Sequence, residues 1–164
     1  MTGAPIPASG GVRADLTPAR AAWPLSAILL AISGAALVVI GLYFALFRPA
    51  LLPEDLRYID RTFEQLAVCA PRLADWLTNV FRVMGGYVLA TGALTTMLAA
   101  TSFRLRQRGA AIAAGIAWLA SIGAMTAVNF VIDSNFKWAI LGIALLWASS
   151  LALFNFEKPS LRKE

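Results

Sequence analysis

The chain has 164 residues, the length of one domain, and 59% of them are hydrophobic while only 14% are charged. A soluble domain carries about 25% charged residues because its surface must be solvated, so this composition excludes an ordinary soluble protein. The charged residues are also segregated, which leaves four long stretches nearly free of charge. The net charge of +5 comes from basic residues at the ends of these stretches, as in a membrane protein, and does not indicate nucleic-acid binding.

The chain has no histidine and a single cysteine, Cys69. Ligation by imidazole is thereby excluded, and a zinc or iron–sulfur site would need several thiolates or imidazoles. The sequence therefore predicts neither a metal nor a cofactor. Cys69 is expected to be a small buried apolar residue rather than a reactive thiol.

The N-terminal region divides into a polar tail and a first span. Residues 1–20 are rich in Pro, Gly, Ala and Ser without apolar periodicity, so we expect a mobile cytoplasmic tail. The apolar run at 23–47 is too long for a signal-peptide core of about 7–15 residues. As a helix it would reach about 37 Å, enough to cross a hydrocarbon core of roughly 30 Å with some tilt.

Three further apolar stretches follow, at about 81–103, 110–132 and 138–156. Each must be helical, because an exposed strand edge has no hydrogen-bond partner in lipid. Residues 21–158 are thus predicted to form an all-α membrane domain, a bundle of four transmembrane helices. Residues 159–164 would be a second cytoplasmic tail.

The segment between the first two spans, residues 53–80, has a helical pattern of its own. Pro53 and the two acids after it stand where the first turn of a helix favours them. Pro71 would end this helix, because it has no amide hydrogen to donate. We expect a short external amphipathic helix and then a bent entry into the second span. Two apolar stripes at helical spacing support this, one of Leu56, Ile59, Phe63 and Leu66, the other of Leu73, Trp76, Leu77 and Val80.

The basic residues predict the orientation. The connection between the second and third spans packs Arg104, Arg106 and Arg108 into five residues with no acid. With the two tails, this side of the membrane carries eight basic residues against six on the opposite side. By the positive-inside rule, both termini are expected in the cytoplasm.

Two segments resemble small uncharacterised bacterial four-helix membrane proteins that are broadly similar to the DoxX-like families: Leu52-Pro53-Glu54-Asp55-Leu56-Arg57-Tyr58, and Phe81-Arg82-Val83-Met84-Gly85-Gly86-Tyr87 followed by Ala90-Thr91-Gly92. The resemblance covers about residues 45–100. It implies a four-helix fold and the bacterial inner membrane. For function it implies little: DoxX itself is associated with quinone-linked redox complexes, and no residues here carry that chemistry over.

Small residues, which allow helix backbones to approach closely in lipid, recur at helical spacing in three of the spans. Packing within the bundle is the simpler interpretation, and a partner-binding face is the alternative. The candidate helix-packing face consists of Gly85, Gly86 and Ala90 in the second span, Ala113, Ala117 and Ser121 in the third, and Ala144, Ala148 and Ala152 in the fourth.

A polar column follows the third span. Asn129, Asp133 and Lys137 are four residues apart and would share one face if the helix runs that far. Arg82 should lie at the same external level, so we expect an Arg82–Asp133 pair that clamps the external end of the bundle. A ligand or ion site is the alternative, because ionisable groups at membrane depth are often functional. Snorkelling at helix ends favours the structural clamp.

No catalytic constellation is present, so the sequence predicts a protein that is not an enzyme. The leading hypothesis is an accessory or scaffold subunit that packs against a larger bacterial membrane complex. The alternative is a binder of a hydrophobic ligand, a lipid or quinone, in a pocket below the external helix. A small transporter comes third, because no ionisable residue lies near the middle of a span. The expected partners are membrane lipids and other membrane subunits or further copies of the chain, and not nucleic acid.

Overall fold

The computed structural model describes residues 23–157, and helices make up most of that range. Four helical stretches are long and apolar enough to cross a membrane: Leu25–Leu46, Leu73–Phe103, Arg108–Val131 and Lys137–Phe156. The prediction of four such helices is confirmed. The predicted tails, residues 1–20 and 159–164, lie outside the described residues.

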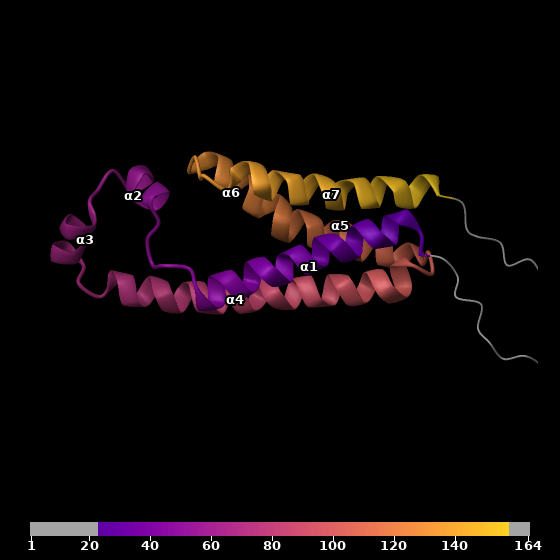
Figure 1. The fold of residues 1–164 in the computed structure, drawn as a ribbon, viewed down its shortest axis with the longest axis horizontal. Helices are drawn as coiled ribbons and strands as arrows, with labels where there is room; N and C mark the ends of the chain where they lie inside the picture. The colour runs from indigo at the N-terminus through magenta and orange to yellow at the C-terminus, as the bar shows by residue number, and fades with distance from the viewer. Residues whose placement is uncertain (1–22, 158–164) are drawn as a thin grey trace, which may run out of the picture.

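The first long helix, α1 (Leu25–Leu46), runs antiparallel to α4 (Leu73–Leu98), which continues into the π-helical turn η1 (Ala99–Phe103). These two helices lie side by side along most of α1, and α7 (Lys137–Phe156) packs on another side of α1 (Figure 1). The start of α1 and the end of α7 lie together at one end of the molecule, called here the termini end.

Glycines bring α1 and α4 into close contact. A Cβ added to Gly92 would lie 2.6 Å from the carbonyl oxygen of Gly34, and a Cβ added to Gly85 would lie 2.5 Å from the backbone nitrogen of Ala45. Gly34 is followed by Gly41 seven residues later, the same spacing as from Gly85 to Gly92, and two helical turns keep each pair on one face. Backbone approach of this kind holds helices together where the solvent is itself apolar.

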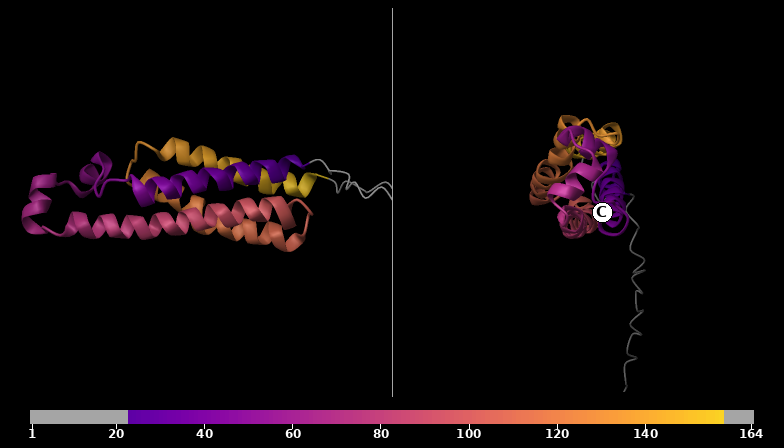
Figure 2. Two further views of the ribbon diagram at one scale, coloured as in Figure 1. Left: turned by 60° about the horizontal axis from the view of Figure 1, so that its bottom comes forward. Right: turned by 90° about the vertical axis from the view of Figure 1, so that its left-hand side faces the viewer.

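The third span is three consecutive helical pieces: α5 (Arg108–Trp118), the π-helical turn η2 (Leu119–Gly123) and α6 (Ala124–Val131). It is the least covered span, with 17% of its most apolar window buried against 39% in α1. The Trp118 indole N–H fastens it to α7 by donating to the carbonyl oxygen of Ala144 at 2.8 Å. The span crosses behind α1 at an angle, and its α6 end packs on α7 rather than along α4 (Figures 1 and 2).

Two short helices connect α1 to α4 where the apolar stripe predicts one: α2 (Pro53–Ile59) and α3 (Phe63–Cys69). The break occurs at Asp60, whose φ of 55° is left-handed and ends α2. Thr62 then caps α3: its hydroxyl oxygen accepts from the Gln65 backbone N–H at 3.3 Å, and the Thr62 backbone N–H donates to Gln65 Oε1 at 3.0 Å. This capping box starts a new helix.

The helix that contains the second predicted span begins at Leu73. After Pro71 the chain enters this helix directly, so the second apolar stripe, residues 73–80, forms the first turns of the helix that also contains the predicted span at about 81–103. The 31 residues from Leu73 to Phe103 reach about 46 Å, well over the roughly 30 Å of a hydrocarbon core. The extra length extends past the end of α1 toward α2 and α3 (Figure 2). Cys69 lies there and is exposed, so the expectation that it is buried is wrong.

Candidate functional site

The end of the molecule opposite the termini, called here the α2 end, is fastened by α2. Glu54, in the first turn of α2, is only 2% exposed, and its carboxylate accepts a 3.3 Å hydrogen bond from the Ser134 hydroxyl. Arg57 donates from Nη2 to the carbonyl oxygen of Asp133 at 3.1 Å. The Ser134 hydroxyl and the Asp133 carbonyl both belong to the turn between α6 and α7, so these two bonds connect α2 to the third and fourth spans.

Arg48 ties the other side of α2 to α1 and α4. Its guanidinium carbon lies 3.5 Å from the ring centroid of Phe81 and 5.3 Å from that of Phe44. Its Nη2 pairs with Asp55 Oδ2 at 2.9 Å, and the Arg48 side chain is only 7% exposed. The same Asp55 oxygen accepts from the Leu52 N–H at 2.9 Å. The pair is thus shielded from water, where charge-assisted hydrogen bonds are strong.

Asp133 stands in the turn after α6 with a left-handed φ of 51°. Its carboxylate pairs with the Lys137 ammonium at the start of α7. The hydrogen bond from Lys137, the charge of Lys137 and then the charge of Arg57 lower the pKa of Asp133 below its ordinary 3.8. A lowered pKa in the folded state stabilises the fold above the unfolded-state pKa. This contribution is lost as the pH falls through the folded pKa, so the pair is intact at neutral pH.

The predicted clamp comes together only in part. Asp133 and Lys137 pair with each other, but Arg82 is exposed on α4 and forms no bond with Asp133 in the described structure. Asn129 donates its amide to the Met125 carbonyl of its own helix at 2.8 Å. The left-handed turn at Asp133 brings its carboxylate to Lys137 of α7, and its carbonyl oxygen accepts from Arg57 of α2. The predicted Arg82–Asp133 pair is therefore wrong.

This geometry gives a double-mutant prediction. The unfolding effects of Arg82→Ala and Asp133→Ala should add within about 0.3–0.5 kcal/mol, as for residues that share no partner. Asp133→Ala and Lys137→Ala should be non-additive, with a small coupling because the Asp133 side chain is exposed and water screens the pair. Thermal unfolding of the purified protein in detergent measures all of these changes. A coupling for Arg82 with Asp133 as large as that for Lys137 would contradict the structure.

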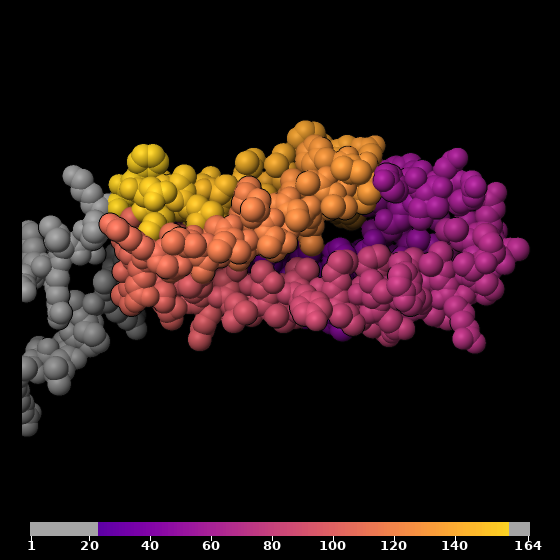
Figure 3. Space-filling view, turned by 180° about the vertical axis from the view of Figure 1, so that it is seen from behind, coloured from indigo at the N-terminus to yellow at the C-terminus, as the bar shows by residue number. Residues whose placement is uncertain are grey.

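A hollow opens between α4 and the third span (Figure 3). In the space-filling view α4 lies below it, the third span above it and α1 behind it, and the segment that includes α2 and α3 closes it at the α2 end. Where the hollow meets α2, a pocket of about 170 Å³ is lined by Asp55, Tyr58 and Ile59 of α2, Leu77 and Phe81 of α4, and Ile132, with residues 50 and 51 completing it.

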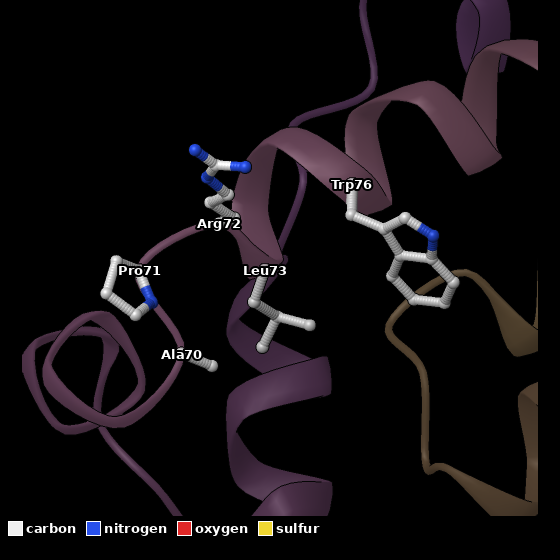
Figure 4. Close-up of a pocket in the computed structure, with 5 residues that line it drawn as sticks. All are labelled: Ala70, Pro71, Arg72, Leu73 and Trp76. Atoms are coloured by element: carbon white, nitrogen blue, oxygen red, sulfur yellow. The ribbon is translucent and has the colours of Figure 1, made fainter.

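A second depression, of about 610 Å³, lies at the elbow between α3 and α4 (Figure 4). Its lining residues all come from the stretch between Ala70 and Trp76, and no other part of the chain within residues 23–157 contributes to the lining. In the close-up, Arg72 points away from the Trp76 ring, so the two form no common wall. The depression is an open surface, and the hollow beside α2 is the better candidate for a site.

The residues of the predicted helix-packing face do not share one environment. Gly85 and Ala144 are buried between helices, in agreement with packing inside the protein. A second group is partly covered: Ala117, Ser121 and Ala148. A third group is exposed: Gly86, Ala90, Ala113 and Ala152.

The termini end holds a polar cluster that the sequence reasoning missed. The Glu157 carboxylate accepts from the Ser26 backbone N–H at 3.1 Å, from the Ser26 hydroxyl at 2.5 Å and from Arg106 Nη1 at 3.2 Å. Arg106 also donates to the carbonyl oxygen of Phe154, and the Ser150 hydroxyl donates to that of Ser26 at 2.8 Å. The cluster joins α1, α7 and the loop after η1. The sequence did contain one indication of this cluster: Ser26 stands in the first turn of a predicted span, where the backbone N–H groups of the helix lack intrahelical partners and can bind a carboxylate.

Among residues 23–157, no three His, Cys, Asp or Glu side chains gather as a metal site would need. No family model, no curated protein and no solved structure matches the chain. The resemblance to the DoxX-like families therefore stays a prediction, and function has to be argued from the two ends of the molecule and the hollow.

Proposed function

We propose that this chain is a membrane protein without enzymatic activity that binds a hydrophobic ligand, a lipid or a quinone, in the hollow between α4 and the third span. One observation carries the proposal: these spans separate toward the α2 end, and α2 crosses the opening between them. No charged residue occurs within 83–103 or 109–132, so the facing stretches are apolar. Such a hollow, reached from the side, suits a molecule dissolved in the bilayer.

The position of α2 favours a small ligand over a partner helix in the hollow. A transmembrane helix lying there would have to pass α2 to leave the membrane. However, α2 is held on one side by the Arg48–Asp55 ion pair and on the other by the Arg57 bond to Asp133. A lipid or quinone ends within the bilayer and needs no such passage.

The proposed setting is the inner membrane of a bacterium, with both termini in the cytoplasm. Its support is the charge pattern: Arg104, Arg106 and Arg108 all follow the second span at the termini end. In this orientation α2 and α3 are external, and the four spans form a bundle that is open on one side.

An accessory subunit is the second candidate function, and the exposed small residues favour it. A Cβ added to Gly86 would meet nothing within 4 Å, and Ala90 follows one turn later on α4, also exposed. A helix of a partner or of a second copy could approach this face closely. Stoichiometric recovery of one partner protein after crosslinking in the native membrane would support this candidate.

Native mass spectrometry of the mildly extracted protein tests the ligand proposal. We expect one small ligand per chain, lost in Leu77→Trp because the larger ring fills the pocket beneath α2. Val83→Trp is the matched control, since Val83 lies six residues further along α4 and is 62% exposed. Bare protein in all samples, or equal ligand retention by Leu77→Trp and Val83→Trp, would contradict the proposal.

A further inference from the structure

The pocket beneath α2 lies at the level where α1 ends. Phe81, which lines it, packs edge-on against Phe44 in the last turn of α1, with 6.1 Å between ring centroids. Leu77, which also lines the pocket, lies one turn before Phe81 on α4. The 22 residues of α1 reach about 33 Å, close to the roughly 30 Å of a hydrocarbon core. With α1 spanning the bilayer, the pocket lies at the membrane boundary, where lipid head groups are found.

The charged groups near the hollow lie at this boundary. The pocket lining includes two polar residues, Asp55 and Tyr58, both from α2. Toward the termini end, α4 and the third span carry no charge over residues 83–103 and 109–132. The site is thus charged at one end and uncharged along its length, which matches an amphiphile with a head group and a chain.

The charges at the α2 end are balanced. Arg48 is paired with Asp55, and Lys137 with Asp133. Anionic head groups are recognised by clusters of basic residues in excess, which this end lacks. A zwitterionic head group presents one charge of each sign and meets no net repulsion here. Residues 48–82 and 133–137 contain six bases, Arg48, Arg57, Arg61, Arg72, Arg82 and Lys137, and six acids, Glu54, Asp55, Asp60, Glu64, Asp75 and Asp133.

We propose that the ligand is a zwitterionic phospholipid, with its head group in the pocket beneath α2 and an acyl chain in the hollow. This inference rests on the proposed function and narrows it to one lipid class. The lipid enters from the leaflet on the α2 side, because its head group lies there and because α4 and the third span are joined at the termini end by the short connection at 104–107. The Tyr58 hydroxyl is the uncharged side-chain donor in the pocket lining and donates to the head-group phosphate.

The test reconstitutes the full chain in three vesicle preparations and compares bound lipid by native mass spectrometry after release into detergent. One preparation is phosphatidylethanolamine with phosphatidylcholine, the second has phosphatidylglycerol added in equal amount, and the third has a quinone added. We expect one zwitterionic lipid per chain in all three. Tyr58→Phe should lower the retained fraction about fivefold, the factor that one neutral hydrogen bond supplies. Tyr87→Phe, at a position on α4 that is 72% exposed, should leave it unchanged.

Preferential retention of phosphatidylglycerol, or replacement of the lipid by the quinone, would overturn the inference while leaving the proposed function intact. Equal retention by Tyr58→Phe and the native chain would also overturn it, because the head group would then lie elsewhere. No bound molecule in any preparation would remove the proposed function as well. A photoreactive phosphatidylcholine added to one side of the vesicles shows the leaflet from which the lipid enters. A membrane-impermeant maleimide that reacts with the exposed Cys69 shows which side of the membrane α2 faces. Photolabelling of the protein only from the termini side would overturn the proposed route.

Discussion

Gly85→Ala should lower the free energy of unfolding by about 1–3 kcal/mol, the usual range for overpacking a tight interface. Gly86→Ala should leave it unchanged or raise it by up to about 1 kcal/mol, because alanine is the better helix former. The two residues are neighbours on α4, but a Cβ at Gly85 would lie 2.5 Å from the backbone nitrogen of Ala45, whereas one at Gly86 meets nothing within 4 Å.

The obstruction at Gly85 cannot be relieved by rotating a side chain. Its nearest neighbours are backbone atoms of Gly41 and Ala45, so α1 and α4 would have to separate as rigid helices. Separation would also loosen the second close contact, between Gly34 and Gly92. Thermal unfolding in detergent, followed by circular dichroism, gives both values. Equal stability of the two variants would mean that the close approach of α1 and α4 is not present in the protein.

The four spans could be predicted because their signal is local. Each is an apolar run long enough for the bilayer, and lipid leaves the backbone no alternative to a helix. The break between α2 and α3 was missed because the apolar stripe continues across it at helical spacing. The left-handed conformation of Asp60 ends α2, and the Thr62–Gln65 capping box starts α3. Thr62 and Gln65 were visible in the sequence, whereas the conformation of Asp60 was not.

The contacts between distant segments could be predicted only in part. Spacing alone placed Asp133 near Lys137, but the partner of Asp133 depended on the direction in which the chain turns after α6. The role of α2 as a bridge depends on Glu54 reaching Ser134, which is eighty residues away in the sequence. The paired glycines of α1 and α4 did have a sequence signal, the repeated spacing of seven.

The polar cluster at the termini end should be the other main contributor to stability. The Arg106 and Glu157 side chains are 17% and 24% exposed, so their ion pair is largely shielded. Removing one partner of a fully buried pair costs about 3–5 kcal/mol, because the remaining charge has no counter-charge. Residual exposure reduces this cost, and we expect about 1–3 kcal/mol for Arg106→Met or Glu157→Gln, in the range for contacting residues.

The double variant separates this ion pair from its surroundings. Arg106→Met with Glu157→Gln should cost clearly less than the sum of the single changes, because neither charge is then left alone. Glu157→Gln alone should cost more than Ser26→Ala, since Glu157 also accepts the Ser26 backbone N–H, which remains in Ser26→Ala.

A control is needed for the backbone of Arg106, whose φ of 59° lies in the left-handed region. Arg106→Gly removes the same side chain as Arg106→Met but relieves the backbone, so it should be the more stable of the two by up to about 1 kcal/mol. If the Arg106 and Glu157 effects add strictly, the two side chains do not interact. The termini end would then be held by the hydrogen bonds of Ser26 with Glu157 and Ser150 and by helix packing.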